Sequence, residues 1–540
     1  MRAPGAGALP VLAIAAAAGA GTMSVELSAV RLLAPWFGTS MVVWTNVIGV
    51  ILLALALGYL MGARLSARPR PLVKLGLLLG CAALTSAWLP ALAGPVCGWF
   101  IPRGVPLHEA ASLFTWGSLA ASLVLFLPAA LLLGTASPLA VEAVQTATGA
   151  HAGTAGGQVL AASTLGSLAG TFATSHLLLP GLGLRSSFLL LAGLLAAAGL
   201  AALLLGRARA AAVGGGAVLL AGLGLSAWLG GMALPEPEGS RVLAQGESAY
   251  QWVRVLETEN YGPRGETMRQ LQVNEGLDSY QSLWKAEPGL LGTGEFYYYD
   301  PFALPAWWAR AEGPWRVLVL GLGGGTALRV IEGASPPGLE PSFTGVELDP
   351  LVVAFGAEHL DLEPDAPNRR ILDDLDARVA LQALPGPFEQ IVLDVYANQF
   401  EVPPHLSTVE FFRELRERLA PGGWLAANAG GFGFDDPVVA ALANTCAAGF
   451  ESPVLVLRVP GSRNYVLFAR RDAPLPIPGG PEWSAEGAVP AVLLPRLELA
   501  GAWRLVEPGG SPVLTDDWNP IEKLQLRSLA EGRARARGEP

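Results

Sequence analysis

Residues 315–350 read WRVLVLGLGGGTALRVIEGASPPGLEPSFTGVELDP, and this stretch decides the fold of the C-terminal half of the chain. Val317–Leu320 is an unbroken apolar run, which is typical of a strand buried on both faces of a parallel sheet. Glycines follow it directly, and Ala327–Ile331 then reads as a helix. A second predicted strand, Phe343–Val346, leads into Glu347. Strand, glycine turn, helix, strand and acid together predict a nucleoside-binding unit.

The glycines of this turn are Gly321, Gly323, Gly324 and Gly325. They allow a tight turn and leave room for a ligand near the helix N-terminus. They do not fit the dinucleotide fingerprint, because Thr326 stands where its last Gly or Ala would be. An acid at the tip of the second strand, such as Glu347, is suited to bind ribose hydroxyls. The alternative is an ordinary tight strand–helix turn.

The alternation of strands and helices continues to about residue 470. It predicts a Rossmann-like, doubly wound α/β sheet, which would bind its ligand at the carboxyl ends of the strands. Four candidate residues lie at or just past such ends: Gly321, Glu347, Asp376 and Asp394. Before this sheet, Tyr250–Glu257 and Arg269–Val273 read as a small antiparallel hairpin or meander.

The N-terminal half has the composition of a membrane protein. The whole chain is 52% hydrophobic and only 15% charged, which is too apolar for a soluble protein of 540 residues. Residues 1–234 carry ten Lys and Arg against three acids, which gives this half a net charge of +7. Because the whole chain has a net charge of −10, the remaining residues carry a net charge of −17. The acidic half argues against nucleic acid and is compatible with a cationic substrate, although a solvated acidic surface explains it equally well.

About seven apolar runs approach the length of roughly 20 residues that a helix needs to cross a bilayer. They are Ala8–Val30, Val43–Gly62, Leu75–Ala93, Leu113–Gly134, Gly157–Leu179, Ser187–Gly206 and Ala211–Met232. We therefore expect a polytopic helical domain in the inner (plasma) membrane, in contact with the lipid bilayer. The basic loop from Arg64 to Lys74 should be cytoplasmic by the positive-inside rule. Seven crossings would then place the acidic half outside the cytosol, so the side that this half faces stays open.

The predicted organisation has five parts. Residues 1–234 form the transmembrane domain, 235–246 a linker, 247–305 a small β subdomain, 306–472 the Rossmann-like domain and 473–540 a Pro- and Gly-rich tail with one short helix. The three cysteines have neither metal nor disulfide spacing, and we expect no metal. A homodimer is left open.

From about residue 245 to 470 the chain resembles the spermidine/spermine synthases, which are aminopropyltransferases related to the class I methyltransferases. With its apolar N-terminal half it resembles bacterial multi-span membrane proteins that carry such a domain. The matching stretches, in order, are ESAYQWVRVLE (247–257), LQVNEG (271–276), GEFYYYDPFALP (294–305), VLVLGLGGGTALRV (317–330), VELDP (346–350), DAR (376–378), IVLDVY (391–396) and LSTVEFFRELRERLAPGGWLA (406–426).

The resemblance implies decarboxylated S-adenosylmethionine, or S-adenosylmethionine itself, as a substrate. Glu347 would bind the ribose hydroxyls and Asp376 the adenine amino group. Gly321, Gly323, Gly324 and Gly325 would pass close to the sulfur. A polyamine would lie near Tyr298, Asp300 and Asp394, with Asp394 as the catalytic base.

The chain departs from the pattern of these enzymes at three places, one of which is Tyr298–Tyr299–Asp300, where they have Tyr-His-Glu. Their glycine loop carries an Asp where this chain has Gly324, and their D-x-x-D segment has a second acid where this chain has Ala397. Both acids would hold ammonium groups, so the chemistry itself is in question. Aminopropyl transfer needs a base to deprotonate the attacking amine, a role that Asp394 could fill.

Alternative functions therefore stay open. One is a catalytically silent sensor of a nucleoside or a polyamine. Another is a transporter with a regulatory domain, for which Glu26, Asn46 and His176 in the apolar half are the polar candidates. A methyltransferase differs from an aminopropyltransferase only in the group that leaves sulfur. Asp394 could also be an acid at a strand end that caps a neighbouring loop.

Overall fold

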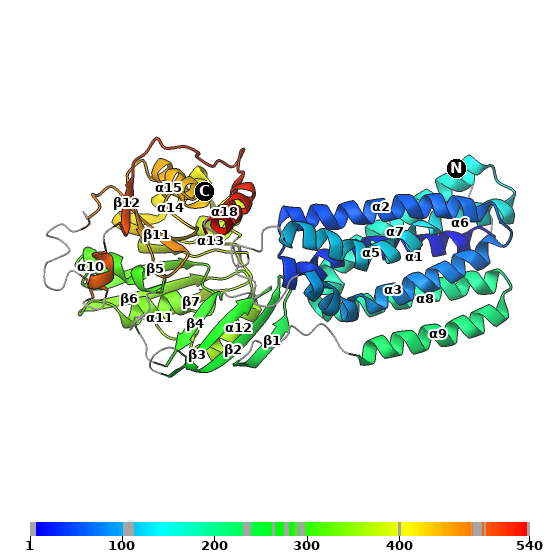
Figure 1. Cartoon of the computed structure of the whole chain (residues 1–540), viewed down its shortest axis with the longest axis horizontal. Coiled ribbons are helices and arrows are strands. Elements are labelled where there is room, and N and C mark those ends of the chain that lie inside the picture. Colours follow the sequence, from blue (N-terminus) through cyan, green and yellow to red (C-terminus); the bar gives the residue numbers. More distant parts are fainter. Residues whose placement is uncertain are drawn as a thin grey trace. The chain divides into compact units, whose positions relative to one another are not determined.

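A computed structural model of the chain describes residues 7–100, 113–229, 239–261, 265–274, 280–286, 289, 291, 297–397, 401–476, 478, 489–490, 493–499 and 501–536. The chain folds into two compact units that divide near residue 235. One unit is helical and the other is α/β (Figure 1). Residues 235–238 of the predicted linker lie outside the described residues.

The helical unit is a bundle of long apolar helices (Figure 1). Its α-helices are α1 (Leu9–Phe37), α2 (Met41–Ser66), α3 (Pro71–Phe100), α5 (Ser118–Gly134), α6 (Ala136–Thr148), α7 (Ala152–Ala173), α8 (Leu179–Leu205) and α9 (Arg209–Trp228). In the described part of the chain, six continuous helices are long and apolar enough to cross a membrane.

Two of the seven predicted runs fall within one of these six helices. Ala152–Leu205 is continuous over 54 residues, which would measure about 81 Å if it were straight, far more than a bilayer core of about 30 Å. Gly183 interrupts it with φ 73° and ψ 174°, which is not a helical conformation. Since both α7 and α8 pack against α1, the chain turns back within this helix.

Small residues bring α1 and α7 into backbone contact, as the run 161–174 predicts. A Cβ on Gly19 would lie 2.1 Å from the carbonyl oxygen of Ser163, and one on Gly166 would lie 1.9 Å from that of Ala16. Thr174 also donates a hydrogen bond of 2.8 Å to Ser24. Thr174 and Ser24 therefore add a hydrogen bond to the packing of these helices.

The α/β unit begins with an antiparallel meander of four described strands, β1 (Ser240–Glu247), β2 (Trp252–Tyr261), β3 (Glu266–Val273) and β4 (Ser282–Lys285). The predicted meander is confirmed, but it starts earlier than expected. The prediction of a linker over 235–246 is wrong from Ser240 onward, because β1 pairs with β2 along its length.

The main sheet has eight strands in the described part of the chain, in the order β12-β10-β11-β9-β8-β5-β6-β7. Its strands are β5 (Gly313–Leu320), β6 (Leu339–Val346), β7 (Arg369–Leu372), β8 (Phe388–Leu393), β9 (Leu419–Gly430), β10 (Val454–Arg458), β11 (Asn464–Arg470) and β12 (Trp503–Val506). The strands from β9 to β7 are parallel, and β10, β11 and β12 are antiparallel to their neighbours. The sheet is therefore mixed at one edge, where a parallel sheet was predicted.

The side chains of alternate β5 residues pack in two separate hydrophobic cores, one on each face of the sheet. Leu318 and Leu320 pack with α13 (Ala377–Ala383), α14 (Val409–Arg418) and α15 (Pro437–Phe450). Val317 and Val319 pack with α10 (Leu304–Trp308), α11 (Thr326–Gly333) and α12 (Pro350–His359). Helices on both faces confirm the predicted doubly wound architecture.

The C-terminal segment is part of this unit and not a tail. Its strand β12 pairs with β10 at the sheet edge. Its last helix, α18 (Ile521–Ala536), has 16 residues and packs against α15. The predicted end of the domain at residue 472 is therefore wrong. Pro- and Gly-rich connections conceal these short elements in the sequence.

Candidate functional site

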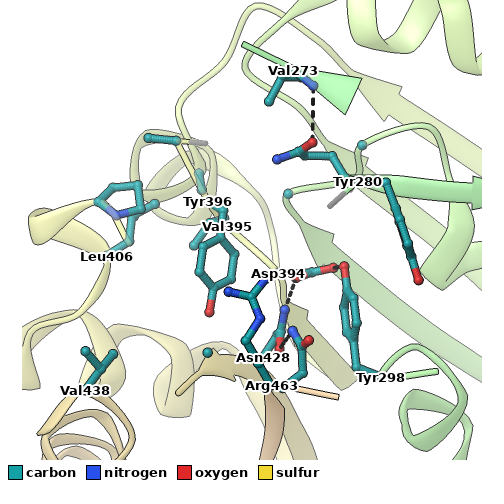
Figure 2. Close-up of a pocket in the computed structure, with 18 of the residues that line it drawn as sticks. Val273, Tyr280, Tyr298, Asp394, Val395, Tyr396, Leu406, Asn428, Val438 and Arg463 are labelled. Carbon is teal, nitrogen blue, oxygen red and sulfur yellow. Dashed lines mark hydrogen bonds between the residues drawn. The ribbon is translucent and has the colours of Figure 1, made fainter. Parts of the chain in front are cut away.

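A cavity of about 1130 Å³ opens at the carboxyl ends of the parallel strands (Figure 2). It lies where β5 adjoins β8, the point at which the order of the strands along the chain reverses direction. Gly321, Glu347, Asp376 and Asp394 all line it, as the prediction from strand ends requires. The sheet topology thus brings residues from four strand ends together.

The glycine turn after β5 lines the cavity through two of its glycines, Gly321 and Gly323. Gly321 has φ 80°, and a Cβ there would lie 2.2 Å from the carbonyl oxygen of Asp394. The absence of a side chain therefore lets the turn after β5 contact the end of β8. Asp394 in turn donates its backbone N–H to Leu320 at 2.9 Å.

The other two glycines of the turn, Gly324 and Gly325, face the protein and are not among the residues that line the cavity. The amide of Gly324 donates to Ser282 at 2.7 Å, so it is occupied by the meander. A Cβ on Gly325 would lie 2.7 Å from the side chain of Leu362. Gly324 thus contacts the meander and Gly325 packs against Leu362.

Thr326 explains why the turn lacks the dinucleotide fingerprint. Its hydroxyl donates to the carbonyl of Leu283 at 3.0 Å and accepts from the amide of Leu283 at 2.9 Å. The Thr326 hydroxyl therefore joins strand β4 to the N-terminus of α11. The Gly or Ala of the dinucleotide fingerprint has no hydroxyl and could not form these bonds.

Glu347 follows β6 and turns back onto the glycine loop. Its Oε2 accepts from the amide of Gly323 at 2.8 Å, and its Oε1 accepts from the amides of Leu348 and Asp349 at 3.0 and 3.2 Å. Burial raises the pKa of the carboxyl, and the Gly323 and Asp349 amides oppose that shift. The predicted proximity of Glu347 to the glycine bend is confirmed.

Asp394 follows β8 and is the acid with the most perturbed ionisation in the described part of the cavity. Its Oδ1 accepts from the side-chain amide of Asn428 at 2.8 Å, and its Oδ2 accepts from the hydroxyl of Tyr298 at 3.2 Å (Figure 2). Burial raises its pKa from 3.8 to about 7, although both hydrogen bonds favour the ionised form, and the charge of Glu347 raises it further. A carboxyl that titrates near neutrality can both accept and release a proton at physiological pH.

Asp376 has a structural partner for each of its oxygens. Its Oδ1 caps α13 by accepting from the amides of Arg378 and Val379, and its Oδ2 lies 2.8 Å from Nε2 of His405. Burial works to raise its pKa, but the His405 contact and the helix amides outweigh it, and the pKa is lowered. Asp376 therefore stays ionised and rigidly placed at the cavity wall.

Tyr298 lines the cavity, whereas its predicted companion Asp300 does not. Burial, followed by the charge of Asp394, raises the pKa of Tyr298 well above its ordinary value, so its hydroxyl stays a donor. Asp300 is fully buried, and its carboxylate accepts from the amides of Leu291 and Tyr297 at 2.8 and 3.3 Å. These two bonds join Asp300 to the backbone of its own segment, and Asp300 is not among the described residues that line the cavity with Asp394.

The polar residues of the cavity wall that were not predicted from the sequence include Tyr396, His405, Asn428 and Arg463. Asn428 had a recognisable signal, because it is a polar residue inside the apolar strand β9. Arg463 had none, since it lies in the short turn between β10 and β11. The cavity is also lined by Gln525, Ser528 and Leu529 of α18, which was predicted to be a tail.

The described residues contain no group of three or more His, Cys, Asp and Glu side chains arranged to hold a metal ion. The cavity offers a carboxyl whose pKa lies near neutrality, a second carboxylate bonded to the glycine turn, and the hydroxyl of Tyr298, which donates to Asp394.

Curated relatives of the chain share one name. It is 29% identical over 304 residues to the "Probable polyamine aminopropyl transferase" of Bifidobacterium longum, which covers 53% of this chain and 62% of that protein. It is 29% identical over 320 residues to the "Polyamine aminopropyltransferase" of Mycobacterium tuberculosis, which covers 55% and 56%. It is 30% identical over 116 residues to the "Polyamine aminopropyltransferase" of Vibrio vulnificus, and this match covers 21% of this chain and 38% of that protein. The chain thus spans between about two fifths and three fifths of the length of these relatives.

Two solved structures are also similar to part of the chain. A probable spermidine synthase from Corynebacterium glutamicum has 23% identity and a TM-score of 0.38, covering 49% of this chain and 91% of that one. The spermidine synthase from Thermotoga maritima has 16% identity and a TM-score of 0.34, covering 54% and 84%. No family model matches the chain. The resemblance predicted from the motifs is confirmed by the curated relatives.

Proposed function

We propose that this protein transfers an aminopropyl-type group from a nucleoside sulfonium to an amine, with Asp394 as the base. One observation carries the proposal: a carboxyl with a pKa of about 7 lies in a large cavity at the switch point of the sheet, beside the turn of Gly321. The names of the curated relatives support the same reaction class.

The nucleoside end of the donor would lie along Glu347 and Asp376. Glu347 is oriented by three backbone amides, so that its carboxylate is preorganised to accept hydrogen bonds from a ribose diol. Asp376 stands at the next strand end and would accept from the adenine amino group. The sulfonium of decarboxylated S-adenosylmethionine or S-adenosylmethionine would lie near the turn of Gly321, between Glu347 and Asp394, since all three residues line the cavity.

The reaction that these groups support balances as a nucleophilic substitution. An acceptor ammonium gives one proton to the Asp394 carboxylate, and the neutral amine attacks the carbon beside sulfur. The new N–C bond forms as the C–S bond breaks, and the electron pair of that bond stays on sulfur. The products are a secondary ammonium and the neutral thioether 5′-methylthioadenosine, and Asp394 then releases its proton to water.

The helical unit is proposed to anchor this activity in a membrane. Its outward-facing side chains include Leu220 and Trp228, which are 76% and 79% exposed, and these belong to α9. Soluble proteins rarely expose apolar surface on this scale, whereas lipid chains would cover it. Asn46 bonds to Thr115 and Ser118 of a neighbouring segment, so it serves helix packing.

Release of 5′-methylthioadenosine by the full-length protein in detergent tests the reaction. We expect Asp394→Asn to lower the turnover rate by about 10² to 10⁴, while donor affinity, measured by calorimetry, changes little. Exposed Glu340→Gln, on β6 but remote from the cavity, is the control.

Three results would contradict the proposal. Donor binding without any product would leave a sensor, release of S-adenosylhomocysteine would indicate methyl transfer, and absence of donor binding would exclude the nucleoside site altogether.

A further inference from the structure

We propose that the α/β unit, with its cavity, lies on the side of the membrane opposite the basic loops of the helical unit, outside the cytosol. This inference rests on the proposed function, in which the helical unit spans a membrane, and it deepens that function by naming the compartment of the reaction. It follows from the direction in which each helix runs through the bundle and from the distribution of positive charge between the two ends of the bundle.

Helices α1 and α7 run in the same direction. A Cβ on Gly166 would lie 1.9 Å from the carbonyl oxygen of Ala16, and the Thr174 hydroxyl donates to Ser24 at 2.8 Å. Residue numbers therefore rise together along the two helices. Helix α7 begins at the end of the bundle where α1 begins.

Helices α1 and α3 finish at the same end of the bundle, and α2 carries the chain back between them. A Cβ on Gly94, near the end of α3, would lie 3.8 Å from the side chain of Trp36, near the end of α1. Residues 38–40 and 67–70 connect α2 to its neighbours. A connection of four residues reaches at most about 14 Å, whereas the 26 residues of α2 extend over about 39 Å. Helix α2 therefore runs opposite to α1 and α3.

Helix α5 runs in the direction of α2. The side-chain amide of Asn46 donates to Ser118 at 2.8 Å, and a Cβ on Gly58 would lie 2.3 Å from the carbonyl oxygen of Leu131. The first turns of the two helices are thus level with one another, and so are their later turns.

Helix α8 runs opposite to α3. A Cβ on Gly76 would lie 2.6 Å from the carbonyl oxygen of Gly199, and a Cβ on Gly206, directly after α8, would lie 3.0 Å from the side chain of Val73. Residue numbers on α8 therefore fall as those on α3 rise.

Helix α9 again runs in the direction of α3. The Ser226 hydroxyl donates to the carbonyl of Ala87 at 2.6 Å, and a Cβ on Gly80 would lie 3.8 Å from the side chain of Leu219. The described part of the bundle thus makes seven passes, in which α1, α3, α7 and α9 run one way and α2, α5 and α8 run back.

The α/β unit is connected to the end of the bundle where α9 finishes. The first end is that of Leu9 and Arg209, where α1 and α9 begin, and the second end is that of Phe37 and Trp228, where they finish. Only residues 230–238 separate the described parts of the two units. These nine residues are too few for a crossing, which needs roughly 20. The α/β unit therefore stays on the side of the second end.

Positive charge is concentrated at the first end. Arg2 and Arg103 are assigned to an end by their sequence positions, before α1 and between α3 and α5. The first end has seven basic residues (Arg2, Arg64, Arg68, Arg70, Lys74, Arg207 and Arg209), and the second end has three (Arg31, Arg103 and Arg185). Since Lys and Arg accumulate in cytoplasmic loops, the first end is cytoplasmic and the second end faces outward.

Tryptophans mark the second end as a boundary between membrane and water. Trp44, Trp99, Trp116 and Trp228 all lie close to that end, and their side chains are exposed. Tryptophan is enriched at such boundaries. The chain therefore reaches the boundary at Trp228, before it enters the α/β unit.

The orientation has a consequence for the supply of substrates. The sulfonium donor carries a fixed positive charge, and the acceptor amine is protonated at neutral pH. A hydrocarbon core of about 30 Å opposes the passage of both cations. A transport step must therefore connect this reaction to any cytosolic pool of donor or acceptor, and 5′-methylthioadenosine is released outside the cytosol.

The test labels cysteines in bacterial spheroplasts that produce the full-length protein. Glu340→Cys places a thiol on the exposed surface of the α/β unit, and His151→Cys places one in the exposed turn before α7, at the first end. A membrane-impermeant maleimide is added to intact and to lysed spheroplasts. The protein without an introduced cysteine measures labelling of its three native cysteines, and a cytosolic thiol protein reports whether the spheroplasts are sealed.

We expect Glu340→Cys to be labelled equally before and after lysis, and His151→Cys to be labelled only after lysis. The reverse pattern would overturn the inference. Labelling of both variants in sealed spheroplasts would also overturn it, because the first end would then not be cytoplasmic.

A charge variant tests the cause of the orientation. Replacing Arg64, Arg68 and Arg70 by Gln leaves four basic residues at the first end against three at the second, so the bias is almost removed. In this background His151→Cys should become partly labelled in intact spheroplasts. Arg316→Gln, which removes a charge from the α/β unit, is the control and should change nothing. An unchanged pattern in the triple variant would overturn the charge assignment.

Failure of the orientation and failure of the proposed function are distinguishable, because labelling does not require turnover. Intact spheroplasts are also given decarboxylated S-adenosylmethionine and putrescine in the medium. Release of 5′-methylthioadenosine by the wild type, but not by Asp394→Asn, would support both proposals. The expected labelling without any release would leave the orientation standing and would remove the proposed reaction.

Discussion

The side-chain amide of Asn428 donates a hydrogen bond of 2.8 Å to the carboxylate of Asp394, from the adjacent strand β9. This bond stabilises the ionised form of a carboxyl whose burial favours the neutral form. Asn428→Ala should therefore raise the pKa of Asp394 further and move the acid limb of kcat upward by about one to two pH units. Asn464→Ala removes a bond to Asn428 and one from Ser462 but no printed bond to Asp394, so it should move the limb less. An unchanged acid limb in Asn428→Ala would contradict this role.

The pH dependence of turnover follows from the same carboxyl. Burial raises the pKa of Asp394 to about 7, and a base must be deprotonated to act, so kcat should fall as the pH drops through about 7 and should be nearly constant above it. Asp376 has a lowered pKa and stays ionised over the same range, so it should not contribute to this limb. The check is a kcat profile from pH 5 to 9, in which a kcat that stays constant as the pH falls through 7 would contradict the assignment.

The site residues that could be predicted from the sequence are those that directly follow a strand. Gly321, Glu347 and Asp394 each follow an apolar run directly, and parallel strands bring such positions to one edge of the sheet. Periodicity alone therefore located three residues that lie up to 73 positions apart in the chain.

The rest of the site depends on packing that the linear pattern does not reveal. Gly324 belongs to the same glycine run as Gly321, yet Ser282 of the meander takes its amide, and no local feature marks this difference. Arg463 enters the cavity because β10 and β11 return antiparallel beside β9. In the same way α18, predicted only as one short helix in a Pro- and Gly-rich tail, packs on α15 and lines the cavity, which its local sequence does not reveal.

Glu347→Gln should weaken donor binding while preserving the fold. The amide can still accept from Gly323, but it loses the negative charge that strengthens bonds from ribose hydroxyls. We expect the dissociation constant of S-adenosylmethionine, measured by calorimetry, to rise by about tenfold to a hundredfold. Glu340→Gln on the same strand is the control and should leave it unchanged. Equal affinities of Glu347→Gln and the wild type would remove Glu347 from the nucleoside site.

Gly321→Ala should be more harmful than an alanine at another glycine with the same backbone conformation. Gly321 and Gly338 have φ of 80° and 83°, but a Cβ at Gly338 has no atom within 4 Å, whereas one at Gly321 would lie 2.2 Å from the carbonyl oxygen of Asp394. Gly338→Ala should cost about 1 kcal/mol from strain alone. Gly321→Ala should cost about 1–3 kcal/mol more and displace the base. Thermal midpoints and kcat of both variants measure the difference, and equal effects would show that β5 and β8 relax to admit the methyl group.

Asp300→Asn should separate a structural acid from a catalytic one. Asp300 is fully buried and accepts from the amides of Leu291 and Tyr297, so an amide in its place keeps the shape but loses charge-assisted bonds, at a cost of about 1.5–3 kcal/mol. The thermal midpoint should fall by a few degrees, because this loss is a large part of the stability of a typical domain. The acid limb of kcat should stay near pH 7, since Asp394 still sets it, whereas Asp394→Asn should abolish that limb. A shift of the limb in Asp300→Asn at an unchanged thermal midpoint would instead return Asp300 to the set of residues that act on the substrate.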